Sequence, residues 1–212
     1  MSLNTTTWTA PGKGALFVVT GASGTGKTTL VREALNSIPG VAFSVSATTR
    51  PIRDGEQNGV DYHFLDREAF MARVKDNAFL EWAEVYGNLY GTLRRPVEEA
   101  LATGESILLD IDTQGAEQVR ATHIHHVSVF ILPPDLQTLA DRLNARATDA
   151  PDVIKLRIEE AQLQLQECRH FDYVVVNDEL SSAHDQFQSI LVAELLRSGR
   201  HSSLIKRFTG DL

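Results

Sequence analysis

Short apolar segments alternate with amphipathic segments along most of this chain. The apolar segments have the length and β-branched content of buried strands and span residues 16–20, 43–46, 106–110, 127–132 and 173–176. The segments between them have helical spacing and span residues 29–36, 96–103, 114–120, 135–145, 152–168 and 181–198. This alternation predicts an α/β fold in which a parallel sheet is covered by helices on both faces. In such sheets, ligands bind at the carboxyl ends of the strands.

Residues 47–93 interrupt the alternation with short extended pieces and polar loops. The pattern predicts a helix over 68–75, with Asp66 as its N-terminal cap. It also predicts a hairpin of residues 79–85 and 89–92 around Gly87-Asn88. We therefore expect this segment to form a small lobe inserted into the α/β core.

The length of 212 residues fits one α/β domain, and we expect no second full domain. The pattern predicts a loose arm over residues 1–13, a single domain over 14–198 and a C-terminal tail over 199–212.

Composition and charge restrict the possible partners. A net charge of −8 disfavours a nucleic-acid polymer as a partner, because such binding depends on clustered Lys and Arg. No stretch approaches the roughly 18 apolar residues of a membrane helix, and no targeting signal opens the chain. The one cysteine, Cys168, has no partner for an internal disulfide and suits a reducing compartment. We expect a cytoplasmic protein that does not contact membranes.

The strongest chemical motif follows the first apolar segment. Residues 21–28 have the spacing G-x-x-x-x-G-K-T between a predicted strand and a predicted helix. In such a loop, backbone N–H groups converge on phosphate oxygens, Lys27 adds a positive charge, and the Thr28 hydroxyl can ligate Mg²⁺. The residues expected to bind a nucleotide here are Gly21, Ala22, Ser23, Gly24, Thr25, Gly26, Lys27, Thr28 and Thr29.

Two carboxylates follow another apolar segment. Asp110 ends the predicted strand at 106–110, where an acid commonly holds Mg²⁺ beside a phosphate loop. Asp112 lies two positions later, on the same side of an extended chain. The loop and the acids alone leave a GTPase, an ATPase and a small-molecule kinase open.

The inserted lobe separates these alternatives. Residues 48–64 read TTRPIRDGEQNGVDYHF and resemble the acceptor-binding signature of guanylate kinases. Further similar motifs follow in the same order at 79–83 (FLEWA), 87–91 (GNLYG), 108–115 (LLDIDTQG) and 172–178 (DYVVVND). The chain thus resembles the guanylate kinase family over residues 15 to 195.

The resemblance implies a GMP site in the lobe. The positions matching Arg50, Arg53, Tyr62 and Tyr90 hold the GMP phosphate, in keeping with guanidinium and phenol donors. Glu81 matches the reader of guanine, whose N1–H and N2–H₂ form a pair of adjacent donors that adenine lacks. The implied base pocket is completed by Ser46, Gly91, Thr92 and Asp112.

The resemblance also implies a short lid over residues 141–157, between core parts 14–46, 94–140 and 158–198. Its arginines, at positions matching Arg142, Arg146 and Arg157, close over the donor phosphates. This chain departs from the family in the lid: it carries Asn144, Ala145 and Ala147 around Arg146, where the family often has glycines, and it also has Pro151. Asn177 and Asp178 match positions near the donor adenine, although Asn-Asp after a strand is also a plain turn signal.

The implied activity is Mg²⁺-dependent transfer of the γ-phosphoryl group of ATP to GMP or dGMP, with Lys27, Arg50 and the lid arginines as catalytic groups. Two alternatives remain open at this point. One is an inactive binding module with the same fold, and the other is a related kinase for another phosphorylated acceptor.

Overall fold

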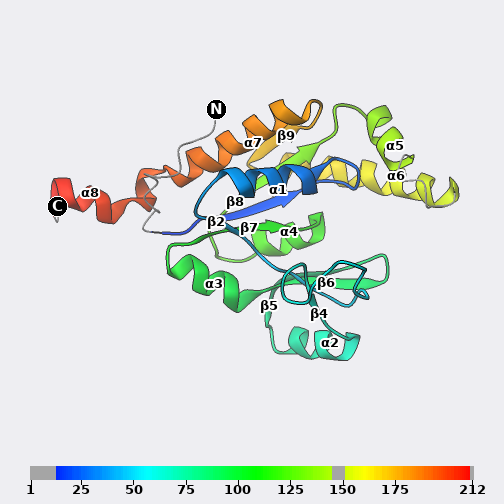
Figure 1. Ribbon diagram of the computed structural model, residues 1–212, viewed down its shortest axis with the longest axis horizontal. Coiled ribbons are helices and arrows are strands. Elements are labelled where there is room, and N and C mark those ends of the chain that lie inside the picture. Colours follow the sequence, from blue (N-terminus) through cyan, green and yellow to red (C-terminus); the bar gives the residue numbers. More distant parts are fainter. Residues whose placement is uncertain (1–12, 145–150, 211–212) are drawn as a thin grey trace.

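The computed structural model describes residues 13–144 and 151–210 (Figure 1). Within them, a five-stranded parallel sheet has the order β2-β7-β1-β8-β9. Its strands are β1 (Leu16–Thr20), β2 (Val41–Phe43), β7 (Ser106–Asp110), β8 (His126–Leu132) and β9 (Tyr173–Val176). Every residue of β1 is buried, as expected for the central strand of a sheet covered on both sides. The predicted α/β class is confirmed.

Helices cover both faces of this sheet. On one face, α1 (Lys27–Ser37) and α7 (Leu180–Leu195) pack against Phe17 and Val19. On the other face, α3 (Arg94–Ala102) and α4 (Thr113–Arg120) pack against Leu16 and Val18. The alternation of β1 side chains between two hydrophobic clusters explains why its sequence is continuously apolar.

A second sheet and one helix form the inserted lobe, which lies below the core in Figure 1. Its order is β4-β3-β6-β5, with β3 (Ala47–Thr48), β4 (His63–Phe64), β5 (Phe79–Val85) and β6 (Asn88–Leu93). The helix α2 (Arg67–Lys75) begins after Asp66, whose Oδ1 accepts a hydrogen bond from the Ala69 N–H at 2.6 Å. The predicted cap is confirmed, and such a cap stabilises a helix by about 1 kcal/mol.

Two predicted boundaries were wrong. The hairpin turns at Tyr86-Gly87, one residue before the predicted Gly87-Asn88. Both turn residues have positive φ, 49° and 78°, as a two-residue hairpin of this hand requires. The strand predicted at 43–46 lies instead at Val41–Phe43, because the chain leaves the core sheet after Phe43 and enters β3 of the lobe.

The remaining helices lie at the two ends of the molecule (Figure 1). The helices α5 (Leu136–Asn144) and α6 (Pro151–Gln166) pack together through Leu139, Leu143 and Ala161. A 3₁₀ turn, η2 (Glu167–His170), follows α6, and the last described elements are the 3₁₀ turn η3 (Ser198–Arg200) and the helix α8 (Ser202–Thr209). The sequence pattern did not predict α8, whose apolar residues Leu204, Ile205 and Phe208 are exposed. In the described part of the chain, no helix combines the length and apolarity needed to cross a bilayer.

Candidate functional site

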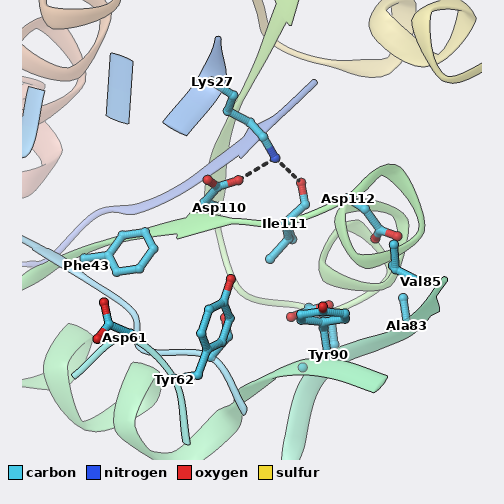
Figure 2. A pocket seen from close by; sticks show the side chains of 13 residues that line it. Lys27, Phe43, Asp61, Tyr62, Ala83, Val85, Tyr90, Asp110, Ile111 and Asp112 are labelled. Carbon is cyan, nitrogen blue, oxygen red and sulfur yellow. Dashed lines mark hydrogen bonds and ion pairs between the residues drawn. The ribbon is translucent and has the colours of Figure 1, made fainter. Parts of the chain in front are cut away.

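A cavity of about 220 Å³ lies between the carboxyl ends of the core strands and the inserted lobe (Figure 2). The core contributes Lys27 and the segment from Asp110 to Asp112, and the lobe contributes side chains from β5, β6 and the loop before β4. Its lining includes the predicted residues Lys27, Ser46, Tyr62, Glu81, Tyr90, Gly91, Asp110 and Asp112. The lining also includes residues for which the sequence predicted no such role: Phe43, Asp61, Ala83, Val85 and Ile111. The folded chain therefore brings most of the predicted acceptor residues to one place.

Lys27 lies at the start of α1 and reaches across to the strand β7. Its Nζ forms an ion pair with the Asp110 carboxylate and donates to the Ile111 carbonyl at 3.1 Å (Figure 2). The lysine also lines a second cavity, formed by the phosphate loop. Its ammonium group thus has access to both cavities.

Glu81 is the most unusual acid of the first cavity. Its side chain is 4% exposed, and Oε1 accepts a hydrogen bond from the Thr92 N–H at 2.8 Å. Burial raises the pKa of Glu81 to about 7, and the negative charge of Asp112 adds to this shift, whereas the hydrogen bond from the Thr92 backbone opposes it. A carboxyl that titrates near neutrality inside a cavity is typical of a binding or catalytic group.

Thr92 contributes its backbone to Glu81 and keeps its own hydroxyl inside the protein. Its Oγ1 is buried and forms no hydrogen bond within the described part of the chain. Asp112 accepts a hydrogen bond from the Gly115 N–H at 2.7 Å and so caps α4 at the edge of the cavity. The described lining of the cavity thus includes four acids, Asp61, Glu81, Asp110 and Asp112, of which Asp112 is fixed by its role as a helix cap.

Tyr62 and Tyr90 form the aromatic wall of the cavity. Their rings meet edge to face with centroids 6.1 Å apart, and the Tyr62 hydroxyl points into the cavity in Figure 2. Burial raises the pKa of Tyr62, and the negative charge of Asp110 adds to the effect. The Tyr62 phenol thus remains a neutral hydrogen-bond donor at physiological pH.

The two predicted phosphate-binding arginines lie beside this wall and do not line the cavity in this structure. The guanidinium of Arg50 lies 5.4 Å from the centre of the Tyr62 ring and forms hydrogen bonds to Glu56 at 2.7 and 3.1 Å. The hydrogen bond to Glu56 raises the pKa of Arg50. Arg53 is exposed, and its backbone N–H donates to Glu56 Oε2 at 2.8 Å.

Glu56 holds together the loop that carries Arg50 and Arg53, and the sequence predicted no role for it. Its carboxylate holds the Arg50 side chain and the Arg53 backbone together, and the Arg50 bond lowers the pKa of Glu56. The signal was present in the spacing Arg-x-x-Arg-x-x-Glu, in which one turn brings the acid back to both arginines. Both terminal nitrogens of Arg50 are therefore engaged by Glu56 in this structure.

The second cavity, of about 260 Å³, is formed by the phosphate loop. Its lining includes Gly21, Ala22, Ser23, Gly24, Gly26, Lys27, Thr28 and Thr29, together with Val85, Tyr86, Asp112 and Gln164. Gly24 and Gly26 have φ values of 89° and 85°, which only glycine adopts without strain. Among the predicted loop residues, Thr25 alone does not line this cavity. Its hydroxyl is buried and donates to the Ala22 carbonyl at 2.9 Å. Its side chain therefore stabilises the loop from inside.

A third cavity, of about 360 Å³, adjoins the loop and includes Arg142, Asn177 and Asp178 in its lining. Both terminal nitrogens of Arg142 donate to the Asn177 carbonyl at 3.1 Å. The Asn177 side chain is 5% exposed and donates to the Thr25 carbonyl at 2.7 Å. Asn177 thus supports the phosphate loop, and Asp178 is the more accessible of the two predicted adenine-side residues.

Part of the predicted lid falls on residues that the structure does not describe. Arg146, Ala145 and Ala147 fall outside the described residues, and so does the side chain of Arg157 in α6. The described part of α6 contacts the hairpin of the lobe, where the Tyr86 hydroxyl donates to Glu160 Oε2 at 3.2 Å. The lobe hairpin and α6 therefore meet beside the phosphate loop, where Tyr86 and Gln164 both line the second cavity.

The described residues offer oxygen ligands to a metal ion. Over 13–144 and 151–210, no group of three or more His, Cys, Asp or Glu side chains is arranged to hold a metal by itself. The predicted ligands Thr28 and Asp110 supply a hydroxyl and a carboxylate, which are the hard oxygen donors that Mg²⁺ prefers. Thr28 lies in the second cavity and Asp110 in the first, with Lys27 lining both.

Comparison with known proteins gives one consistent result. A family model described as guanylate kinase matches residues 13–194. The guanylate kinase of Dechloromonas aromatica is 47% identical over 198 residues, covering 92% of this chain and 98% of that protein. The guanylate kinase of Thermus thermophilus is 50% identical over 188 residues, covering 89% and 85%. A crystal structure of guanylate kinase from Anaplasma phagocytophilum aligns with a TM-score of 0.75 at 33% identity, covering 92% and 93%.

Proposed function

This chain belongs to the guanylate kinase family, and on that premise we propose a role for each site residue in phosphoryl transfer from ATP to GMP. The reaction moves the γ-phosphoryl group of ATP to the phosphate of GMP and yields ADP and GDP. The acceptor is already an anion, so no general base is needed, and positioning and charge neutralisation supply the rate.

The first cavity binds GMP, and the observation that carries this assignment is the buried Glu81 carboxyl. Glu81 accepts from the N1–H and N2–H₂ donors of guanine, and Ser46, Gly91 and Asp112 complete the lining of the base pocket. Thr92 does not line the cavity and contributes to the pocket through its backbone N–H, which holds the Glu81 carboxylate. Tyr62 and Tyr90 donate to the GMP phosphate from the cavity wall. Arg50 and Arg53 join them from the loop organised by Glu56.

The second cavity binds the ATP phosphates through the backbone of residues 21–29. Lys27 moves from Asp110 toward the transferring phosphoryl group, whose charge it neutralises between the two cavities. Arg142, Arg146 and Arg157 add positive charge from the lid, and Asn177 and Asp178 lie on the adenine side. The two cavities share Lys27, Val85 and Asp112, so donor and acceptor face each other across these residues.

We assign Thr28 and Asp110 as the residues that hold Mg²⁺, on the basis of their oxygen chemistry and their positions beside Lys27. When bound, the ion neutralises charge on the phosphate oxygens of the donor.

We further propose dGMP as an acceptor, because the residues assigned to GMP contact the base and the phosphate, and none is assigned to the sugar. The cytoplasm remains the proposed compartment, since the single Cys168 is a free thiol.

A panel of acceptors tests this assignment directly. With ATP and Mg²⁺, we expect GDP or dGDP to form from GMP and dGMP, and little product from AMP, UMP or CMP. Excess EDTA is expected to abolish turnover, and added Mg²⁺ to restore it. GMP binding without any GDP formation would instead indicate an inactive binding module, and preference for another phosphorylated acceptor would indicate a related kinase.

The acceptor affinity is expected to depend on pH through Glu81. GMP offers two donors, so it binds the carboxylate and disfavours the protonated acid, which carries a donor of its own. With a pKa of about 7, Glu81 is mostly ionised above neutrality and mostly protonated below it. The KM for GMP should therefore rise as pH falls through 7, approaching about tenfold per pH unit well below it.

The measurement is KM for GMP at saturating ATP and Mg²⁺ between about pH 5.5 and 8.5. The GMP phosphate also titrates in this range, so Glu81→Gln provides the baseline that retains only the ligand's own titration. Superimposable pH profiles for the two proteins would contradict the assignment.

A further inference from the structure

One side of the helix α4 faces the strand that carries Glu81. Asp112, Gly115 and Gln118 recur every three residues, so they lie on the same side of the helix. Asp112 caps the helix and lines the GMP cavity. The other two residues contact β5 directly, one at the Glu81 side chain and one at the backbone of Trp82.

We propose that Gly115 and Gln118 are specificity-determining positioning residues, which together fix the Glu81 carboxyl in the orientation that reads guanine. This inference rests on the proposed role of Glu81. Neither residue lines the cavity, so both act through Glu81 and neither touches the acceptor.

Gln118 holds the backbone next to Glu81. Its side-chain amide donates through Nε2 to the Trp82 carbonyl at 2.6 Å and accepts through Oε1 from the Trp82 N–H at 3.1 Å. β5 is an outer strand of the second sheet, so these backbone groups point away from β6. The amide thus takes the place of a neighbouring strand, and a glutamine supplies both the donor and the acceptor that this requires.

The strand needs this support at this point. The register of β5 against β6 is irregular between Phe79 and Glu81, so the regular ladder is interrupted immediately before the guanine reader. Beyond the irregularity, Glu81 pairs with Thr92, and Trp82 pairs with Gly91. Gln118 fixes the first residue after Glu81 from the outer side, and this restricts rotation of the local backbone.

Gly115 fixes the side chain of Glu81. A Cβ atom at this position would lie 2.5 Å from Glu81 Oε2 and 3.3 Å from Asp112 Oδ1. The backbone of Gly115 cannot move away easily, because its N–H is bonded to Asp112 at 2.7 Å. Glycine therefore lets the carboxyl lie against the helix backbone, and any larger residue pushes the carboxyl toward the cavity.

Two substitutions test the two contacts separately. Gln118→Met keeps the length and helix propensity of the side chain but removes both hydrogen bonds. Gly115→Ala adds the single carbon that collides with Glu81. Their matched controls are Gln114→Met, on the exposed side of the same helix, and Gly199→Ala, where an added Cβ meets nothing within 4 Å.

The readouts are KM for GMP, KM for ATP and the ratio of kcat/KM for GMP to that for IMP, whose base lacks the 2-amino donor. Each test variant should raise KM for GMP roughly tenfold and lower the GMP-to-IMP ratio several-fold, while KM for ATP stays within about twofold. A purely structural role would instead lower thermal stability and activity with the ratio unchanged. Either that result or behaviour equal to the controls overturns the inference.

Glu81→Gln, measured in parallel, separates this inference from the function on which it rests. If Glu81→Gln leaves the GMP-to-IMP ratio unchanged, the role of Glu81 fails and the inference fails with it. If Glu81→Gln lowers the ratio and neither positioning variant does, the inference alone fails. In the Glu81→Gln background, Gln118→Met should not lower the ratio further. An additional loss there would show that Gln118 acts independently of Glu81.

Discussion

Replacement of Lys27 by alanine is expected to lower kcat by a factor on the order of 10³, while KM for GMP changes by less than about threefold. Lys27 is the positive charge that lines both cavities, and charge accumulates on the transferring phosphoryl group between them. The acceptor is held by other residues, so its ground-state binding should persist. Steady-state kinetics at saturating ATP, with GMP varied, measure both quantities.

The variant also removes the ion pair with Asp110, so a loss of folding must be separated from a loss of catalysis. Lys27→Met retains the aliphatic stem and should show the same loss of kcat, with a thermal transition close to that of the parent protein. Lys75→Ala removes an exposed lysine at the end of α2 and should leave the kinetics unchanged. Turnover of Lys27→Ala equal to that of the parent protein would remove Lys27 from the mechanism.

The sequence predicted the parts of the site that depend on local chain geometry. The phosphate loop is one continuous turn between β1 and α1, so its spacing and glycines were sufficient to place it. The five core strands followed from continuous apolar runs, because both sides of this sheet are buried. The cap at Asp66 was predicted for the same reason, since a helix cap involves residues close together in the chain.

Contacts between distant segments were not predictable in this way. Gln118 bonds Trp82 across 36 positions, and Asn177 bonds Thr25 across 152, so neither contact leaves a periodic signal. The resemblance placed Asn177 near the adenine, whereas the fold turns its amide onto the phosphate loop. The spacing of Arg50, Arg53 and Glu56 was visible in the sequence. Its role became clear only from the fold, in which Arg50 is bonded to Glu56 and lies against the Tyr62 ring.

The arrangement separates recognition of the base from the chemistry of transfer. The residues around Glu81 belong to β5, β6 and α4, whereas Lys27 is the first residue of α1. Mutations in the two groups should therefore affect different kinetic parameters: acceptor discrimination for the first, and kcat for the second.

Glu81→Gln is expected to reduce the preference for GMP over AMP, expressed as the ratio of kcat/KM values, by on the order of 100-fold. The glutamine carbonyl can still accept from the Thr92 N–H, which leaves the amide NH₂ facing the two donors of guanine. The donors of the amide then face the donors of guanine. Residue 81 is only 4% exposed, so water cannot compensate for the lost hydrogen bonds. AMP gains in relative terms, because adenine presents an acceptor at N1 to the new amide.

Glu84→Gln is the matched control, since Glu84 lies on the same strand with its side chain 48% exposed and paired with Arg67. It should leave both substrates unaffected, because an exposed pair of this kind contributes little. Loss of GMP activity without any change in the GMP-to-AMP ratio would mean that Glu81 supports the cavity without reading the base. A reduced ratio for Glu81→Gln and a parental ratio for Glu84→Gln would assign guanine recognition to the buried carboxylate itself.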